Sequence, residues 1–298
     1  MKDKLYKIKV IIVTFNSEEV IETCLKKLSE SYKQCYLDVV VVDNGSSDST
    51  LDILAESQGR YLKYQIVLSE NLGWGHANNI VLKDVLEKEA NNFDAVLLLN
   101  PDAEAPKGAL DVFADVLLSS SNRIAGISPY LVESTGRIAP MKSLFGKKLK
   151  HVVIKGAQHV LSDRLHGAFM LISVDALIKV GLIDENYFLY MEEVDWCVRA
   201  KNMGYTLLIS EEISMLHRVD SEERPHRIYY QWRNEFYFTY KNFKFPVAAY
   251  YLIRRFFLTL PSAMLSFFRL MRWDLVKACV YGVLDGVRFK KGKSKEYT

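Results

Sequence analysis

Apolar and polar residues follow a repeating pattern through the first hundred positions of the chain. Four short apolar runs are each long enough for a strand buried on both faces of a sheet. They are Val10–Val13, Leu37–Val42, Tyr64–Leu68 and Ala95–Leu99. The segments between them carry apolar residues at helical spacing, as at Val20, Cys24 and Leu28. Strands that alternate with helices predict an α/β protein with a parallel, doubly wound sheet.

Polar residues follow each of these runs. They include Thr14 and Asn16 after the first, Asp43, Gly45 and Ser46 after the second, Asn71, Gly73 and Asn78 after the third, and Asn100 and Asp102 after the fourth. Parallel strands end at one edge, where open α/β sheets bind ligands. A carboxylate at that edge can hold a divalent cation, and the cation can hold a diphosphate. Asn100-Pro101-Asp102 as a plain turn and Asn71 and Asn78 as helix caps stay open as alternatives.

The chain beyond residue 105 has a less regular pattern. It predicts a surface helix at 107–118 and strands at 166–172 and 206–209, and Gly167 would allow a close backbone approach. The stretch Ile124–Leu161 has weak periodicity and carries glycine, proline and several lysines. We expect it to form a mobile loop near the site.

Three acidic residues lie within four positions after an aromatic-rich segment. Glu192, Glu193 and Asp195 follow Phe188 and Tyr190 and would open a helix. Acidic residues in a first helical turn are stabilised by the helix dipole, which alone would explain them. The neighbouring aromatic rings, Trp196 among them, would also form an apolar pocket. Such a pocket raises a carboxyl pKa and makes the group a better general base.

Composition limits the class of protein. The 298 residues are 49% hydrophobic and 25% charged, which is typical of a globular protein. The four cysteines are far apart and form no CxxC pair, so neither a structural zinc site nor a disulfide framework is expected. The N-terminal residues lack the pattern of a signal peptide. We therefore expect a cytoplasmic protein.

Basic residues are concentrated at the C-terminal end. From Pro246 onward ten basic residues stand against three acidic ones, a charge of +7 that leaves −4 for the rest of the +3 total. Arg254, Arg255 and Pro261 interrupt the apolar run at 248–270, so a spanning helix is not expected. The pattern favours helices that lie on an anionic membrane surface, and a helical cap with its own core is the alternative.

The motifs together resemble family 2 glycosyltransferases of the GT-A fold. The resemblance implies a Rossmann-like, mixed but mostly parallel sheet flanked by helices, with a C-terminal helical extension that associates with membranes. It divides the chain into a transferase domain at 1–242, with a nucleotide-sugar half to about 120 and a catalytic half after it, and an extension at 243–298. Hydroxyls and backbone N–H groups of the loop at 45–49 suit a ribose or a phosphate.

The resemblance also assigns roles to residues. Asp43 matches the position that binds the nucleotide base, with Thr14 and Asn16 beside it. Asp102 matches the last acid of the DxD metal motif, although Asn100 replaces its first acid, and His217 matches a histidine that completes the metal site. Glu193 matches the catalytic base, and Asp195 and Glu192 stay open as alternatives. Further contacts with the donor or the acceptor are expected from Trp74, His166, Gly167, Trp196, Arg233 and Asn234.

The implied reaction is a single displacement with inversion, assisted by Mn²⁺ or Mg²⁺. L-rhamnose from dTDP-rhamnose is the favoured donor sugar, because the Arg233-Asn234 pair resembles one in rhamnosyl-transferring members, and a UDP-sugar is the alternative. The implied acceptor is a hydroxyl of a lipid-linked polysaccharide precursor at the inner face of the plasma membrane. A sugar nucleotidyltransferase and a non-catalytic glycan-binding protein stay open as other classes. A nucleic-acid partner is not expected, and a homodimer is left open.

Overall fold

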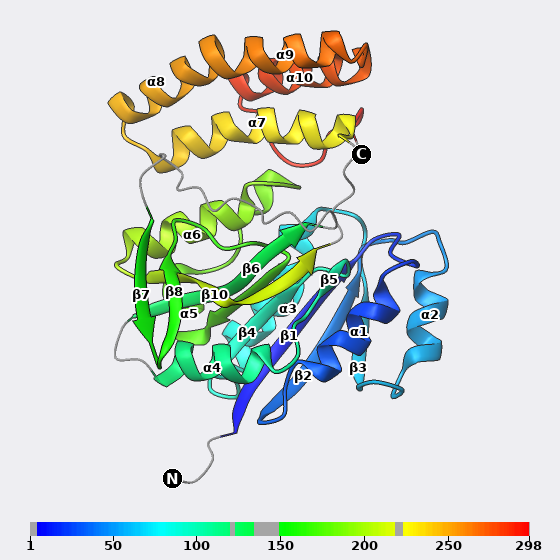
Figure 1. The fold of residues 1–298 in the computed structure, drawn as a ribbon. Coiled ribbons are helices and arrows are strands. Elements are labelled where there is room, and N and C mark those ends of the chain that lie inside the picture. Colours follow the sequence, from blue (N-terminus) through cyan, green and yellow to red (C-terminus); the bar gives the residue numbers. More distant parts are fainter. Residues whose placement is uncertain (1–4, 120–122, 134–148, 218–222, 298) are drawn as a thin grey trace.

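A computed structural model describes residues 5–119, 123–133, 149–217 and 223–297 of the chain (Figure 1). One mixed sheet runs through the molecule, helices cover both of its faces, and a separate layer of helices lies at one end. The predicted mixed α/β sheet flanked by helices is confirmed.

The first part of the sheet is parallel. Its strands are β1 (Tyr6–Thr14), β2 (Cys35–Asp43), β3 (Tyr64–Leu68) and β4 (Ala95–Leu99). They lie in the order β3-β2-β1-β4, and Thr14 pairs with Asp43 in register. The connecting helices are α1 (Ile21–Glu30), α2 (Thr50–Ser57) and α3 (Trp74–Lys88). All four strands therefore end at one edge.

The second part of the sheet is largely antiparallel. Beyond β4 come β9 (Phe169–Ser173), β6 (Ile124–Glu133), β10 (Thr206–His217), β8 (Ala157–Leu161) and β7 (Lys150–Ile154), and the short β5 (Ala103–Glu104) pairs with the end of β10. Because β9 is antiparallel to both β4 and β6, and β10 is parallel to β6, the carboxyl ends of β6 and β10 point toward the same edge as that of β4.

The prediction of a mobile loop at Ile124–Leu161 was wrong for the residues that the structure describes. The described parts of that stretch form β6, β7 and β8, and residues 134–148 lie outside the described residues. A two-residue turn joins β7 to β8, with Lys155 and Gly156 both at positive φ (54° and 82°), the backbone shape that suits tight hairpins. The strand expected at 206–209 is also longer and continues to His217.

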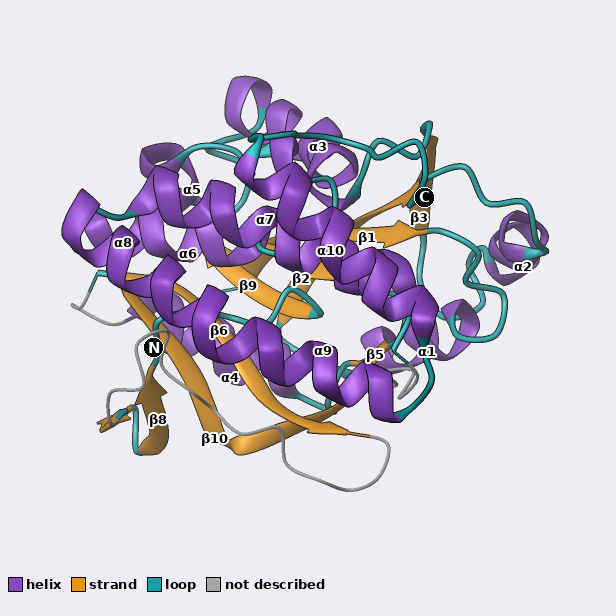
Figure 2. Ribbon diagram, turned by 90° about the horizontal axis from the view of Figure 1, so that it is seen from above, coloured by secondary structure: helices purple, strands orange, loops and turns teal. Residues whose placement is uncertain are grey.

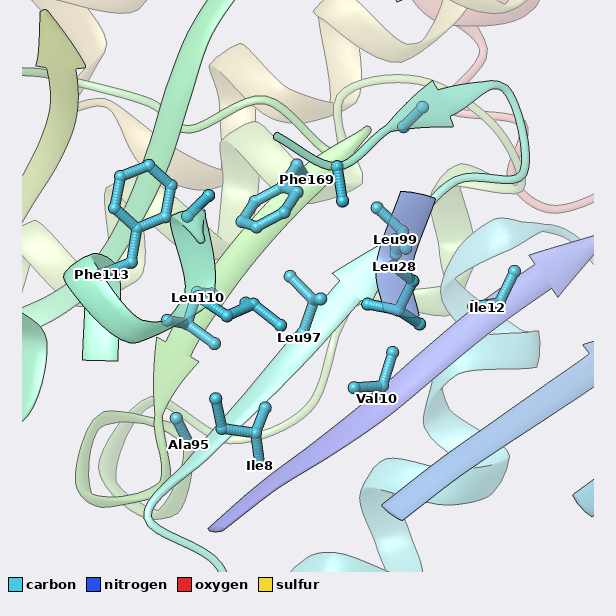
Figure 3. Packing of buried hydrophobic residues seen from close by; sticks show 14 of the residues in the cluster. Ile8, Val10, Ile12, Leu28, Ala95, Leu97, Leu99, Leu110, Phe113 and Phe169 are labelled. Atoms are coloured by element: carbon cyan, nitrogen blue, oxygen red, sulfur yellow. The ribbon is translucent and has the colours of Figure 1, made fainter. Parts of the chain in front are cut away.

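The core consists of two apolar layers, one on each face of the sheet. Alternate residues of β1 point to opposite faces. Val10 belongs to the layer that contains residues of α1 and α4 (Ala109–Ser119) (Figure 3), and Ile11 belongs to the layer that contains residues of α3. The second layer also holds α5 (Val174–Val180) and α6 (Glu192–Asn202), and the short η1 (Glu185–Tyr187) precedes α6. Burial on both faces explains why the strands read as continuous apolar runs.

The C-terminal helices form a layer of their own (Figures 1 and 2). They are α7 (Pro225–Asn242), α8 (Phe245–Arg254), the π-helical η2 (Arg255–Thr259), α9 (Leu260–Arg269) and α10 (Trp273–Val287). Gly282 lets α10 approach α7 closely, since a Cβ there would lie 2.6 Å from the carbonyl oxygen of Tyr229. The boundary expected at residue 242 thus falls within one packed group of helices. No helix in the described ranges has the length and hydrophobicity to cross a membrane.

Candidate active site

The carboxylate of Asp43, at the sheet edge, accepts four hydrogen bonds. The Thr14 hydroxyl donates to Oδ1 at 3.0 Å, and the Ser46 hydroxyl donates to the same atom at 2.6 Å. The backbone N–H groups of Gly45 and Ser46 donate to Oδ2 at 3.2 and 2.9 Å. These bonds fix the loop after β2 against the end of β1. Nucleotide binding at this place stays a prediction.

Asn16 joins the same two loops from the other side. Its backbone N–H donates to the Ser46 hydroxyl at 2.9 Å, and its Oδ1 accepts from the backbone N–H of Ser47 at 2.9 Å. The residue has a positive φ of 47°, a conformation that asparagine tolerates better than most residues. Thr14, Asn16, Asp43 and the 45–47 loop therefore form one rigid unit with Asn16 exposed.

The two asparagines on the next part of the edge are placed differently. Asn71 accepts at Oδ1 from the Asn44 side chain at 3.3 Å. Asn78 lies inside α3 and donates to the Trp74 carbonyl at 2.9 Å, so it is not an N-cap. Its buried Oδ1 has no hydrogen-bond partner among the described residues. Contact between the donor and Asn71 or Asn78 stays a prediction.

Trp74 connects the end of β4 to the start of α3. Its indole Nε1 donates to Oδ1 of Asn100 at 2.9 Å, and the Asn100 backbone N–H donates to the Ala168 carbonyl at 3.0 Å. Gly73 just before it has φ 105°, and a Cβ there would lie 2.3 Å from the Phe188 carbonyl oxygen. Only glycine fits at this position.

The expected metal ligands come from a turn and from the end of a strand that lies beside it. Asp102 lies between β4 and β5, and the backbone of His217 pairs with Ala103 next to it. The side chain of His217 is outside what the structure describes. No group of three or more His, Cys, Asp or Glu side chains that could hold a metal occurs among the described residues. A carboxylate such as that of Asp102 suits Mn²⁺ or Mg²⁺ whose other ligands are substrate phosphates, and metal binding by Asp102 and His217 stays a prediction.

Glu192 and Glu193 open α6, as predicted, and both are in an apolar setting. Burial first, and then the charge of Glu193, raise the pKa of Glu192 well above its ordinary value of 4.5, and its Oε2 has no partner among the described residues. Burial also raises the pKa of Glu193. Because two neighbouring carboxyls do not both ionise easily, the one with the lower pKa loses its proton first.

Glu193 lies against Gly167 and Trp74. A Cβ at Gly167 would lie 3.5 Å from Glu193 Cγ and 3.7 Å from Trp74 Cζ2, ordinary contact distances, so both side chains border this glycine. Trp196 borders the same apolar space and is itself buried, with Nε1 donating to the Gly181 carbonyl at 2.9 Å. His166 is partly buried on the same loop. The structure thus brings Trp74, Gly167 and Glu193 together.

Asp195 has a different environment from its two neighbours. It is fully buried, and it accepts from Arg199 Nε and Lys241 Nζ, both at 2.9 Å. Tyr187 and Asn242 donate to its other oxygen at 3.2 and 2.9 Å. Both oxygens are therefore used to join α6 to α7.

Arg233 and Asn234 are also occupied by the protein itself. They are 1% and 2% exposed, and their side chains donate to the backbone carbonyls of residues 187, 189, 190 and 292. Their direct contact with donor or acceptor stays a prediction, and this geometry favours an indirect role.

Two residues that hold η1 in place were not predicted from the sequence. Glu185 accepts from Asn79 at 2.8 Å and pairs with His76 at 2.8 Å, which ties η1 to α3. Burial alone would raise the pKa of Asp184, but hydrogen bonds from Lys241, the Asn186 backbone and Tyr237 lower that pKa to about 2. The acidic-aromatic run was the only local signal for either residue.

The chain is similar over most of its length to characterised transferases. It is 25% identical over 95% of its length to the low-salt glycan biosynthesis hexosyltransferase Agl10 of Haloferax volcanii, 92% of which is covered. It is 25% identical over 93% of its length to the dTDP-rhamnosyl transferase RfbF of Shigella flexneri, 94% of which is covered. It is 25% identical over 70% of its length to the N-acetylglucosaminyl-diphospho-decaprenol L-rhamnosyltransferase of Mycobacterium tuberculosis, 75% of which is covered.

Two solved structures share the fold of this chain. The family is given by a sequence model. TarS 1–349 of S. aureus in complex with UDP-GlcNAc has a TM-score of 0.61 at 18% identity, covering 95% of this chain and 81% of that one. PcManGT of Pyrobaculum calidifontis in complex with GDP-Man and Mn²⁺ has a TM-score of 0.59 at 15% identity, covering 95% and 88%. The sequence model of glycosyl transferase family 2 matches residues 9–181, more than half of the chain. The protein therefore belongs to glycosyl transferase family 2 and is a glycosyltransferase.

Proposed function

We propose that this protein transfers a sugar, with inversion, from a nucleotide-diphosphate donor to a hydroxyl of a lipid-linked glycan. One observation supports the proposal above the others: Glu193 lies against Trp74, and Trp74 is hydrogen-bonded to Asn100 at the edge where Asp43 and Asp102 lie. A candidate base and a candidate nucleotide site thus share one wall. The family match argues against the nucleotidyltransferase alternative.

The sheet edge would hold the donor. The side chain of Asn16, which is exposed, and the loop that Asp43 fixes would face the nucleotide. Asp102 and His217 would hold a divalent cation, which when bound neutralises charge on the departing diphosphate. Mn²⁺ in the neighbouring PcManGT structure supports this choice of ion.

Glu193 is the proposed base. It would take the proton from the acceptor hydroxyl as that oxygen attacks the anomeric carbon on the face opposite the diphosphate. Glu192 is a weaker candidate, because it is only 4% exposed, and Glu193, not Glu192, lines the apolar space beside Trp74. Asp195 is weaker still, because Arg199, Lys241, Tyr187 and Asn242 use both of its oxygens.

L-rhamnose from dTDP-rhamnose is the proposed donor sugar, and a UDP-sugar is the second candidate. The names of the relatives from Shigella and Mycobacterium support rhamnose, while TarS, bound to UDP-GlcNAc, keeps the alternative open. The Mycobacterium relative, named for a diphospho-decaprenol acceptor, supports a lipid-linked acceptor here.

We also propose that α8, η2 and α9 lie on an anionic membrane surface. More than half of the exposed large apolar side chains in the described ranges fall between 245 and 289, and α8 and η2 bury none of their residues. No acidic residue occurs from Phe236 to Trp273, while Arg254 and Arg269 are exposed. Apolar area together with unopposed cations suits an anionic interface.

The transferase proposal is tested with a panel of nucleotide sugars in the presence of Mn²⁺. We expect dTDP-rhamnose to release dTDP fastest, and we expect either EDTA or Asp102→Ala to abolish the response to Mn²⁺. Release of nucleotide diphosphate is measured by chromatography, with and without a polyprenyl-diphosphate-linked sugar. If no donor is turned over under any condition, the proposal is wrong.

Membrane association is tested by co-sedimentation with vesicles that contain anionic lipid. The double change Phe256→Ser and Phe257→Ser, at positions 45% and 70% exposed, should sharply reduce the bound fraction. Val153→Ser, at a site 68% exposed on β7, is the matched control and should bind like the unaltered protein. Equal binding by all three proteins would assign the helical layer a purely structural role.

A further inference from the structure

The segment that leads into the acidic helix α6 has an unusual backbone. Phe188, Tyr190 and Met191 have positive φ values of 67°, 65° and 80°, and none of them is glycine. Such conformations are strained for residues that carry a side chain, and they persist only where the surrounding structure holds them. The strain ends at Met191, immediately before Glu192. Some feature of the fold must therefore hold this loop, residues 187–191, in place.

The carbonyl groups of the loop are held by two buried side chains of α7. The Asn234 amide donates to the carbonyls of Tyr187, Leu189 and Tyr190 at 3.0, 2.7 and 2.9 Å. An amide carries only two N–H protons, so at least one of them is shared. Arg233 Nη2 adds a bond to the Tyr187 carbonyl at 2.8 Å, and Arg233 Nε donates to Asn234 Oδ1 at 2.9 Å, which orients the amide.

The chain beyond α10 completes this arrangement. Arg233 Nη1 donates to the Gly292 carbonyl at 2.6 Å, and the Gly292 backbone N–H donates to the Asn186 carbonyl at 2.7 Å. Lys293 lies over the Phe188 ring, 5.8 Å from its centre. Lys293 therefore lies against the loop, and the carbonyl of Gly292 accepts from the remaining arm of the guanidinium.

On its other side the loop contacts the donor half. The Phe188 carbonyl accepts from the Trp74 backbone N–H at 3.0 Å, at the point where Gly73 leaves no room for a side chain. All four carbonyls from Tyr187 to Tyr190 thus have partners, three from α7 and one from α3. The same loop leads directly into Glu192 and Glu193 and also contacts the backbone of Trp74.

We propose that Arg233 and Asn234 are positioning residues for the transfer reaction. They hold the strained loop so that Glu193 stays in its apolar site and Trp74 stays against Asn100, and neither residue contacts a substrate. This inference rests on the proposed transferase function with Glu193 as the base. It gives the buried Arg-Asn pair an indirect role in the reaction, through the loop that the pair holds.

The test compares Asn234→Ala with Tyr229→Phe. Tyr229 is on the same helix and equally buried, but its hydroxyl donates to Asp285 on α10 and not to the loop. We expect Asn234→Ala to lower kcat about 100-fold with the donor KM within about twofold, because a misplaced base slows chemistry without weakening donor binding. The apparent acidic pKa in the pH dependence of kcat should also fall in this variant, since a loosened loop admits water to Glu193.

Tyr229→Phe should keep both kcat and that pKa, even where its Tm falls as far as that of Asn234→Ala. If the two variants show the same kcat and the same pH profile, the proposal is overturned and the pair only stabilises the fold. If Asn234→Ala does not fold, Arg233→Lys takes its place, because an ammonium cannot bond Asn234, Tyr187 and Gly292 in the same planar arrangement.

Amide hydrogen exchange separates this inference from the transferase proposal. Asn234→Ala should speed exchange in the 186–193 segment at least tenfold, and Tyr229→Phe should not. If the unaltered protein turns over no donor, the transferase proposal fails, and exchange alone decides whether the pair holds the loop. Unchanged exchange in Asn234→Ala overturns the inference whatever the activity.

Discussion

Asp43 and Glu192 are both nearly inaccessible carboxylates, 2% and 4% exposed, yet their surroundings are opposite. Asp43 accepts four hydrogen bonds from Thr14, Gly45 and Ser46. Glu192 has an oxygen without a partner among the described residues, and its pKa is raised. The donors around Asp43 use its oxygens to fix the loop after β2. The start of α6 disfavours charge, which suits accepting a proton.

Asp195 shows that position in the helix does not decide this character. It lies two residues after Glu193 in the same first turn, but two cations and two further donors surround it. Three acids that look alike in sequence thus fall into two classes, a structural anion and a pair of candidate proton acceptors.

The largest expected effect comes from removing the proposed base. Glu193→Gln should lower kcat by about 10³, within the range of general-base losses, because the amide cannot take the acceptor's proton. The Kd for the nucleotide diphosphate should change by less than about twofold, as calorimetry can measure. An active Glu193→Gln beside an inactive but folded Asp195→Asn would reverse the assignment of the two acids.

Asp195→Asn should mainly affect stability. The change leaves Arg199 and Lys241 without their shared buried anion and should lower the free energy of unfolding by about 3 kcal/mol, measured by urea denaturation. Asp163→Asn, in the more exposed pair with Lys201, is the control and should lose much less. Equal losses in the two variants would show that the Asp195 network is not a special feature of the α6–α7 junction.

Glu192→Gln should give the smallest effect, and in the opposite direction. The pKa of Glu192 is raised in the folded protein, which means that the native state binds this proton more tightly than the unfolded state does. The carboxyl therefore destabilises the fold as the pH rises above 4.5, its ordinary pKa, toward the higher folded value. The variant should therefore be more stable by about 1 kcal/mol at pH 8 and no more stable at pH 4. A gain that is the same at both pH values would point to packing instead of charge.

Local patterns predicted the parts of the site that depend on neighbouring residues. The loop after β2 was recognisable because Asp43, Gly45 and Ser46 bond within three positions of one another. The start of α6 at Glu192 was recognisable for the same reason, since the acids follow directly on an aromatic run. The apolar runs gave the strands because burial on both faces removes polar residues from them.

The remaining parts depend on residues far apart in the chain. Asn234 bonds carbonyls 44 to 47 positions away, and the cation and amide that bind Asp195 lie 46 and 47 positions away. No local pattern records such contacts. The hairpin β7–β8 was missed because much of it is exposed, so its residues do not alternate clearly.

The pH dependence of kcat decides most directly whether a buried carboxyl of α6 is the base. The unaltered enzyme should show an acidic limb with an apparent pKa clearly above 4.5, because burial raises the pKa of Glu193. Glu192→Gln should keep that limb. The assignment of Glu193 would be contradicted if the acidic limb had the ordinary pKa of a glutamate. It would also be contradicted if the limb disappeared in Glu192→Gln.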